Sequence, residues 1–537
     1  MFVTHYLLSL LIWIPITGGV YTLAVEKILS GKKKTIFSSV IFISIITILL
    51  ACILYLDFDY TNANLQFVEN ISWFSLLSGN ESVVYKLGVD GFSVLFIILS
   101  SFSNLVIILF SFLRSNTKCT GFFLIITGLT NGIFCAQDTI LFYFFWEILL
   151  IPTTLGIGIW GNYRRKSAAI KYFFYSFFGS VFLLLALLYI HQQVALLAPT
   201  TLPDADTFSI HNFIYWATQV DRMGHLINIT VNIQWFLFGA LFLAFAIKFP
   251  IWPLHSWLPE LHLASPIGGS VALMILMVKP GVYGIFRFLL PILPTISIGF
   301  DWFLVSISLI TIIYAGIVAI AQTNLKSLIA YSSISHMGLI MLAISSVFLL
   351  INNNSDRVLG IADAQLAIQG AIFQAITYAF SSGGMFIGCN YLHTRLGTNN
   401  INDIKGLAHS MPVFSIFFML FCISNIGFPG TTGFVGEFLI ILSVFKYSPL
   451  VAFFAAFTLI LSPVYTLWMY KRVFFGTASY KNGKTCGAPD INIFEMFILS
   501  LMLIPIIVFG IYPEPILKVS SFTSTNIINA AHMITIG

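Results

Sequence analysis

The stretch that decides the fold runs from Gln234 to Phe288 and reads QWFLFGALFLAFAIKFPIWPLHSWLPELHLASPIGGSVALMILMVKPGVYGIFRF. Lys248 and Lys279 lie inside apolar runs long enough to enter a bilayer, and each is followed within two residues by a proline. A charge at the bilayer centre costs at least about 2.5 kcal/mol, so such lysines should face a partner or a water-filled path. Proline removes a helix hydrogen bond, and hydrocarbon tolerates the freed carbonyl only where protein or internal water satisfies it. The combination of charge and helix break predicts an ion pathway.

The composition surrounding this stretch excludes an ordinary soluble globule. Of the 537 residues, 58% are hydrophobic and 8% charged, and the mean hydropathy is +0.96. Soluble domains carry roughly 25% charged residues. We therefore predict an all-α polytopic membrane protein. Because no signal peptide and no Arg-rich transit peptide precede the first apolar run, we expect direct insertion from the inside.

Apolar runs of about 20 residues, the length that a hydrocarbon core of about 30 Å requires, can be drawn about fourteen times. We expect the spans at 4–25, 35–56, 91–113, 119–137, 139–160, 168–190, 234–258, 266–290, 301–322, 327–350, 361–391, 411–445, 449–475 and 492–512. Two of them, 234–258 and 411–445, contain prolines or glycines that predict broken helices. The polar interval 191–233 has room for a short surface helix around FSIHNFIYWATQV at 208–220.

Basic residues predict the orientation. Lysines and arginines concentrate in the loops that follow odd-numbered spans, and few occur in the other loops. By the positive-inside rule, the basic loops face the cytoplasm or the matrix, and both termini face the opposite side. The regular alternation also supports the count of fourteen.

Charged residues inside the expected membrane spans are the candidate functional residues. Most acidic residues sit in loops or at span ends, so four interior charges remain: Glu147, Lys248, Lys279 and Glu437. Two of each sign fit mutual compensation, because an unpaired buried charge shifts its pKa or draws in water. Glu147 and Glu437 could instead form static salt bridges between packed helices.

Three histidines add possible proton relays. His255 and His262 follow Lys248 at intervals of seven residues, and His336 lies in the middle of a span among serines. Imidazole, with an unperturbed pKa near 6.5, suits proton transfer at neutral pH, although a lone membrane histidine is often only a packing residue. The six cysteines form no C-x-x-C pair, so we expect no iron–sulfur or zinc site.

Five motifs stand in order along the chain. They are LGVDGFS at 87–93, DTILFYFFWE at 138–147, AIKFPIWPLHSWLPELHLASP at 246–266, LKSLIAYSSISHMG at 325–338 and NIGFPGTTGFVGEF at 425–438. With these motifs the chain is similar to the antiporter-like membrane subunits of respiratory complex I, and the resemblance covers about residues 87–475. Among the three such subunits, it is most similar to the one with a glutamate in a broken twelfth span, which Glu437 matches.

The resemblance implies a fold of fourteen helices with two inverted five-helix repeats, each with a broken helix and a half-channel. The chain would divide into an N-terminal three-helix segment (1–118), a first repeat (119–290), a second repeat (301–475) and a C-terminal helix and tail (476–537). Glu147 and Lys248 would form the charge pair of the first half, and contact or separation of the pair would control whether the lysine keeps its proton. Lys279 would be the central lysine, His336 a connecting relay and Glu437 the outlet group.

The sequence departs from the family pattern at three places. Tyr378 stands where the family usually has histidine, Glu260 replaces an aspartate, and Pro280 replaces a small residue. A tyrosine hydroxyl does not hold an extra proton at neutral pH. We therefore expect transfer from His336 to Glu437 to run through ordered water beside Tyr378, helped by the hydroxyls of Thr377, Ser381 and Ser382.

The resemblance implies a proton-translocating membrane-arm subunit of NADH:ubiquinone oxidoreductase. The chain itself should hold no cofactor, because NADH, FMN, the iron–sulfur clusters and ubiquinone would bind in partner subunits. The expected partners are the two sister antiporter-like chains, the redox arm and lipids, with no nucleic acid. The alternatives are a subunit of a multisubunit cation/proton antiporter and a structural subunit with a decayed channel. Abundant Phe, Ile, Asn and Tyr favour an organelle-encoded chain in the mitochondrial inner membrane over a bacterial plasma membrane.

Overall fold

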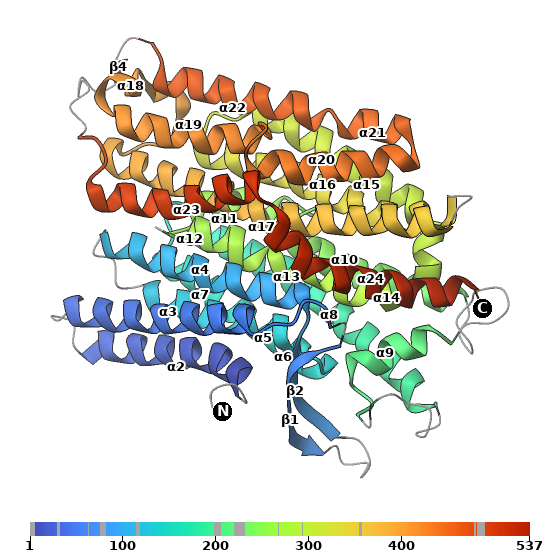
Figure 1. The fold of residues 1–537 in the computed structure, drawn as a ribbon. Helices are drawn as coiled ribbons and strands as arrows, with labels where there is room; N and C mark the ends of the chain where they lie inside the picture. The colour runs from blue at the N-terminus through green and yellow to red at the C-terminus, as the bar shows by residue number, and fades with distance from the viewer. Residues whose placement is uncertain are drawn as a thin grey trace.

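The computed structural model describes most of the chain. The described residues are 6–28, 33–62, 64–75, 82–113, 119–197, 204, 206–219, 231–266, 268–292, 294–353, 357–476, 479–480 and 489–536. In this part the fold is almost entirely helical, and the long helices run roughly parallel to one another (Figure 1). Helices close every backbone hydrogen bond within one segment, which a bilayer requires.

Three long helices and a hairpin form the N-terminal segment. The helices are α2 (Leu7–Ile28), α3 (Lys33–Leu56) and α4 (Gly91–Leu113), and the hairpin pairs β1 (Gln66–Ser75) antiparallel with β2 (Ser82–Val89). The hairpin projects below the helices at the bottom of Figure 1. The hairpin was not predicted from the sequence, because polar residues such as Glu69 and Asn70 interrupt the alternation of apolar and polar residues that marks a strand. Glu69 is in fact buried and accepts hydrogen bonds from the backbone of Leu8 and Ser9.

The next helices include the stretch around Lys248 and Lys279. They are α5 (Thr120–Cys135), α6 (Thr139–Ile148), α7 (Leu150–Trp160), α8 (Arg165–Ala195), α9 (Ile210–Ala217), α10 (Val231–Lys248), α11 (Trp257–Ala264), α12 (Gly269–Ala272), α13 (Lys279–Gly284) and α14 (Leu290–Ile292). Two π-helical segments, η3 (Leu273–Met277) and η4 (Ile285–Leu289), flank α13. The span at 139–160 is divided at Leu149, and the expected surface helix is α9. Residues 198–203, 205 and 220–230 of the polar interval lie outside the described residues.

The remaining elements follow in the same pattern. They are α15 (Pro294–Ala321), α16 (Leu325–Asn353), α17 (Arg357–Leu396), η5 (Ile401–Asp403), β3 (Ile404–Lys405), α18 (Leu407–Ser410), α19 (Pro412–Ile426), α20 (Thr432–Tyr447), α21 (Pro449–Ala455), α22 (Thr458–Phe474), β4 (Ser479–Tyr480), α23 (Ile493–Ile511) and α24 (Glu514–Ile536). Strand β3 pairs antiparallel with β4. Beyond the last expected span, α24 follows α23 and packs against α4, α14 and α17.

The predicted fold class is confirmed. Eleven described helices are long and apolar enough to cross a membrane, and three shorter apolar helices (Thr120–Cys135, Asn232–Lys248 and Pro412–Ile426) accompany them. Both expected breaks are present, between α10 and α11 and between α19 and α20. The span that contains Pro280 is not broken but passes through π-helical turns.

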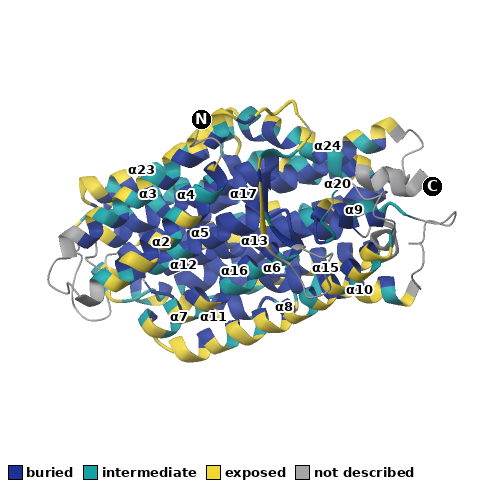
Figure 2. Cartoon of the chain, turned by 90° about the horizontal axis from the view of Figure 1, so that it is seen from below, coloured by how far each residue is buried: buried dark blue, intermediate teal, exposed yellow. Residues whose placement is uncertain are grey.

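The helices α16 and α17 and the segment around α13 form the buried core of the bundle. Figure 2 shows these elements dark blue, whereas exposed residues line the peripheral α7, α8 and α10. The apolar stretch of α16 is entirely buried, and the apolar stretch of Gly269–Ile292 is almost entirely buried. These central elements carry His336 and Lys279, so the fold surrounds both groups with protein and leaves neither to face lipid.

Candidate functional site

Lys248 is the last residue of α10 and is 2% exposed. Its Nζ donates a hydrogen bond to the Trp146 carbonyl oxygen at 3.1 Å and lies 3.5 Å from the centroid of the Trp146 ring. Three features stabilise the cation: the carbonyl, the π-face and the negative end of the α10 dipole. The break after α10 also frees the Ile247 carbonyl, which the indole of Trp257 satisfies at 2.9 Å. The broken helix therefore creates a cation site inside the bundle.

Glu147 lies beside this site without touching the lysine. It belongs to α6, which Asp138 caps by accepting from the backbone N–H groups of Ile140 and Leu141. Glu147 is half-buried, and its Oε2 atom is buried without a hydrogen-bond partner. Among the described residues, no ion pair within 4.0 Å joins it to Lys248. In this structure Glu147 and Lys248 therefore form no direct ion pair, and the lysine is held instead by Trp146, the residue that precedes Glu147.

Lys279 is 1% exposed, and its Nζ has no hydrogen-bond partner within the described part of the chain. Its helix packs tightly against the break after Lys248. A Cβ added at Gly281 would lie 2.7 Å from the Phe249 nitrogen and 3.1 Å from the Lys248 carbonyl carbon. Gly281 therefore allows the backbones that carry the two interior lysines to meet.

His255 and His262 do not share one face of a continuous helix, because the break separates them. His255 lies before α11, with its ring centroid 5.4 Å from that of Tyr314 and 6.2 Å from that of Tyr331. His262 lies in α11, stacked on Phe386 at 4.4 Å. Both ring nitrogens of His262 are buried without a described partner. Glu260 is exposed and pairs with Lys171 at 2.7 Å, away from the buried groups.

His336 and Glu437 are in direct contact. The His336 Nδ1 and Glu437 Oε1 atoms are 3.1 Å apart, and the two side chains are 2% and 1% exposed. The angular geometry does not make a hydrogen bond, so both side chains keep unused hydrogen-bonding capacity. The expected route through water between these residues is wrong, because the fold brings α16 and α20 together at this point.

Tyr378 lies beside His336 and not between His336 and Glu437. Its ring centroid is 4.4 Å from that of His336, and its hydroxyl is 3.3 Å from Ser332 Oγ and 3.2 Å from Ser333 Oγ. The hydroxyls of Thr377, Ser381 and Ser382, which we expected to help, bond instead to carbonyls of their own helix.

A buried polar cluster continues from Tyr378. Ser332 also bonds to Tyr465 at 3.0 Å and contacts Asn425, and Asn425 donates to Thr466 at 3.0 Å. The cluster joins four helices, α16, α17, α19 and α22, next to the His336–Glu437 contact. The serines of the motif at 325–338 indicated polarity there, but their partners on other helices could not be read from the sequence.

Glycines shape the second break around Glu437. Gly427 ends α19 with φ +79°, and a Cβ there would lie 2.8 Å from Glu437 Oε2. A Cβ at Gly433 would lie 2.1 Å from the Ser424 carbonyl oxygen, and one at Gly436 would lie 2.2 Å from Gln374 Oε1. The glycines of this motif thus make room for the carboxylate and for the chain that folds back beside it.

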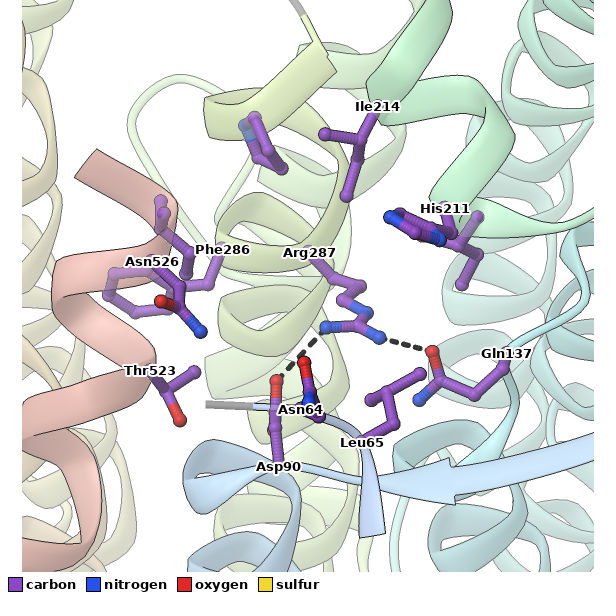
Figure 3. Close-up of a pocket in the computed structure, with 13 residues that line it drawn as sticks. Asn64, Leu65, Asp90, Gln137, His211, Ile214, Phe286, Arg287, Thr523 and Asn526 are labelled. Carbon is purple, nitrogen blue, oxygen red and sulfur yellow. Dashed lines mark hydrogen bonds and ion pairs between the residues drawn. The ribbon is translucent and has the colours of Figure 1, made fainter. Parts of the chain in front are cut away.

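Further charges are buried, so the count of four interior charges was too low. Asp301 is 1% exposed with neither oxygen hydrogen-bonded to a described group, and Lys326 is 2% exposed. Both lie at the ends of the spans expected at 301–322 and 327–350, where hydropathy does not distinguish burial by neighbouring helices from exposure to water. Asp90 and Arg287 form an ion pair at 3.0 Å, and Arg287 also bonds to Gln137. Figure 3 shows this pair in a pocket of about 410 Å³ that α24 also lines.

A second pair ties the hairpin to the segment before α9. The Lys86 Nζ is 2.9 Å from Asp204 Oδ2, and His211 Nδ1 lies 3.7 Å from the same oxygen. The bonds from His211, Ser209 and Lys86 hold the pKa of Asp204 well below its usual range. This cluster lies outside the spans. Among the described residues, no group of three or more His, Cys, Asp or Glu side chains has the spacing of a metal site.

Comparisons with known proteins agree with this arrangement. The sequence profile of a family described as "NADH:quinone oxidoreductase/Mrp antiporter, TM" matches residues 136–462. The NADH-quinone oxidoreductase subunit M of Rickettsia bellii is 33% identical over 535 residues, which cover 97% of this chain and 98% of the relative. The NADH-ubiquinone oxidoreductase chain 4 of Chondrus crispus is 34% identical over 503 residues, 93% of each chain.

A solved structure shows the same fold. A chain of respiratory complex I from Thermus thermophilus superposes with a TM-score of 0.80 at 24% identity, over 98% of this chain and 99% of that one. Together with the near full-length identity to subunit M and chain 4, the profile match shows that this chain belongs to the NADH:quinone oxidoreductase/Mrp antiporter transmembrane family.

Proposed function

We propose that this chain is a proton-translocating membrane subunit of an NADH:quinone oxidoreductase. The observation that carries the proposal is a set of buried titratable side chains, Lys248, Lys279, His336 and Glu437, on the helices of a chain that is similar to subunit M over nearly its whole length. Buried ionisable groups are costly and mark ion pathways. Their placement on central and broken helices favours transport over a purely structural role.

Each group has a separate role in this proposal. Lys248 carries a proton while its ammonium group contacts the Trp146 carbonyl oxygen and ring. The lysine releases this proton when the distance between Lys248 and the Glu147 carboxylate increases. Lys279, which has no acceptor among the described residues, receives a proton and passes it on. His336 then transfers a proton between Nδ1 and the Glu437 carboxylate over their 3.1 Å contact. His255, His262 and Tyr378 line this route as possible relays.

The energy source lies in other subunits. We propose that NADH, FMN, the iron–sulfur clusters and ubiquinone bind to partner chains and that this chain has no redox centre. The partners would be the two sister antiporter-like chains and the redox arm. Conformational change or charge transferred from those neighbours would then shift the separation of Glu147 and Lys248.

We further propose that the chain lies in the mitochondrial inner membrane with both termini facing the intermembrane space. The uneven distribution of basic loops supports this orientation. A bacterial plasma membrane, with termini in the periplasm, is the alternative. A protease added to sealed vesicles of known orientation distinguishes the two sides of the membrane, because cleavage at either terminus must occur from the outer face.

Substitution of the central lysine tests the proposed function. Lys279→Met keeps the aliphatic stem and removes the charge, so the complex should assemble while its proton pumping falls. The measurement is acidification driven by NADH in proteoliposomes, with assembly followed by gel electrophoresis of the intact complex. Lys166→Met, at an exposed lysine, is the matched control. Full pumping by an assembled Lys279→Met complex would overturn the proposal, and failed assembly would favour a packing role for Lys279.

The family name includes Mrp antiporters, so a subunit of a cation/proton antiporter is the second candidate. Copurification separates the two candidates. A complex that carries flavin and iron–sulfur centres supports the oxidoreductase, and one without them that exchanges Na⁺ for H⁺ supports the antiporter. A third candidate, a structural subunit with a decayed channel, requires that the buried charges be replaceable without effect on pumping.

A further inference from the structure

A basic pocket lies at one end of the bundle, where α22 finishes beside β3 and η5. Its volume is about 480 Å³. In Figure 1 this end of the molecule can be found by the labels β4 and α18 at the upper left. The side chains that matter for its chemistry are Lys405, Lys471, Arg472, Asn402, Trp468 and Phe475. Three of these side chains are cationic, and no carboxylate lines the pocket.

The cations of the pocket are available to a ligand. Within the described residues, no carboxylate lies within 4.0 Å of Lys405, Lys471 or Arg472. Asp403, the acidic residue next in sequence to the pocket, accepts a hydrogen bond from Asn400 at 3.1 Å. Arg472 donates to the Asn402 side-chain oxygen, and its guanidinium carbon is 4.7 Å from the Trp468 ring centroid. These two contacts hold the guanidinium in place, whereas both lysines are exposed, each on a flexible four-carbon stem.

The pocket also has an apolar side, formed by two partly exposed aromatic residues at the end of an apolar helix. The apolar stretch of α22 lies within Pro449–Phe474, and Lys471 and Arg472 occupy its last turn. Trp468 is 45% exposed and Phe475 57% exposed at the same level. Tryptophan is enriched where a helix leaves the hydrocarbon, and basic side chains there reach toward the headgroups. In the orientation that the distribution of basic residues predicts, Lys405, Lys471 and Arg472 all face the inside.

We propose that this pocket binds the headgroup phosphate of an anionic phospholipid. The planar Arg472 guanidinium would form a bidentate contact with the phosphate oxygens, and Lys405 and Lys471 would supply the remaining positive charge. The exposed faces of Trp468 and Phe475 would contact the first part of the acyl chains. Basic pockets between membrane helices are known sites for such headgroups. The proposal is independent of the proposed proton translocation.

Two matched double variants test the proposal in the purified complex that contains the full chain. Lys405→Gln/Lys471→Gln removes two charges from the pocket, and Arg164→Gln/Lys166→Gln removes two exposed charges elsewhere. Phosphatidylglycerol is titrated into the delipidated complex, and native mass spectrometry counts bound lipids. One basic residue near an anionic surface is worth about 1 kcal/mol, so the pocket variant should bind about 30-fold more weakly and the control should be unchanged. Arg472→Lys, which keeps the charge, should also weaken binding.

Three outcomes overturn the proposal. Equal losses in both double variants would show that binding depends only on overall surface charge. Equal binding of phosphatidylcholine and phosphatidylglycerol would show that the anionic charge is not recognised. Displacement of the lipid by an equal concentration of inorganic phosphate would show a soluble-anion site instead. If a variant fails to assemble, a photoactivatable phosphatidylglycerol still decides the matter on the wild-type complex, because it must label peptides within residues 458–476.

Discussion

Single residues show three ways in which this chain accommodates a charge inside the bundle. Lys248 sits on a helix C-terminus, a carbonyl and an indole ring. Glu437 is in contact with an imidazole, and glycines leave the space for its carboxylate. Lys279 has no acceptor among the described groups, so packing contacts do not explain its charge. An unpaired buried cation favours a group that changes its proton during function.

Tyr378→Phe tests whether the tyrosine hydroxyl is part of the route. The hydroxyl contacts Ser332 and Ser333, and Ser333 also bonds to the Ile329 carbonyl oxygen. Because His336 meets Glu437 directly, we expect assembly with a stability loss of about 1 kcal/mol and nearly normal pumping. His336→Gln, which keeps hydrogen bonding but cannot carry a proton as imidazole does, should reduce pumping about 100-fold. Loss of pumping in an assembled Tyr378→Phe complex, measured in proteoliposomes, would place the hydroxyl in the route.

At the scale of elements, broken helices place charged side chains where a continuous helix could not. The first break leaves Lys248 at a helix end, and Trp257 satisfies the carbonyl of Ile247. The second break depends on a left-handed glycine whose missing Cβ leaves room for Glu437. The β1–β2 hairpin, which lies outside the spans, is held differently, by the ion pair of Lys86 with Asp204.

Gly427→Ala should disrupt the second break, and Gly430→Ala is its control. Both glycines have positive φ, +79° and +88°, so alanine costs about 1–2 kcal/mol of backbone strain at either position. A Cβ at Gly427 also meets Glu437 Oε2 at 2.8 Å, whereas one at Gly430 meets nothing within 4 Å. Gly427→Ala should therefore reduce pumping much more than Gly430→Ala at equal assembly. Equal pumping in the two variants would show that the contact with Glu437 does not matter.

Acid should release the hairpin from the segment before α9. The pKa of Asp204 is lowered in the folded chain by bonds from His211, Ser209 and Lys86, so the stabilisation is fully present above the unfolded value near 3.9. It is lost as the pH falls from about 4 through the lower folded pKa. Hydrogen exchange of residues 83–89 should therefore be faster in Asp204→Asn than in wild type at pH 7, and the difference should shrink as the pH falls from about 4 to about 3. A difference that stays unchanged between pH 7 and pH 3 would rule out this linkage.

At the scale of the whole molecule, the buried core and the candidate site coincide. The entirely buried α16 carries His336, and the almost entirely buried segment around α13 carries Lys279. A bundle whose centre is this well packed transmits small displacements between neighbouring helices. The division into two inverted repeats, at 119–290 and 301–475, stays a prediction.

Glu147→Gln tests coupling across the molecule. The carboxylate is half-buried beside the Trp146 carbonyl that holds Lys248, so removing its charge should weaken proton binding at Lys248 and slow pumping. Quinone reduction should slow in parallel, since tightly coupled electron transfer cannot run ahead of the pump. Glu260→Gln, at an exposed carboxylate paired with Lys171, is the control. Normal quinone reductase activity with full pumping in Glu147→Gln would remove Glu147 from the mechanism.

The sequence by itself determined the membrane class, the two broken helices and the buried state of Lys248, Lys279 and Glu437. These follow from local physics, because apolar run length, proline, glycine and charge act within one segment. Only the tertiary structure decided that His336 touches Glu437, that Lys248 rests on Trp146, and that Asp301 and Lys326 are buried. These contacts join helices that are distant in the chain. Their geometry depends on how neighbouring helices pack. The hydropathy of a single span gives no information about this packing.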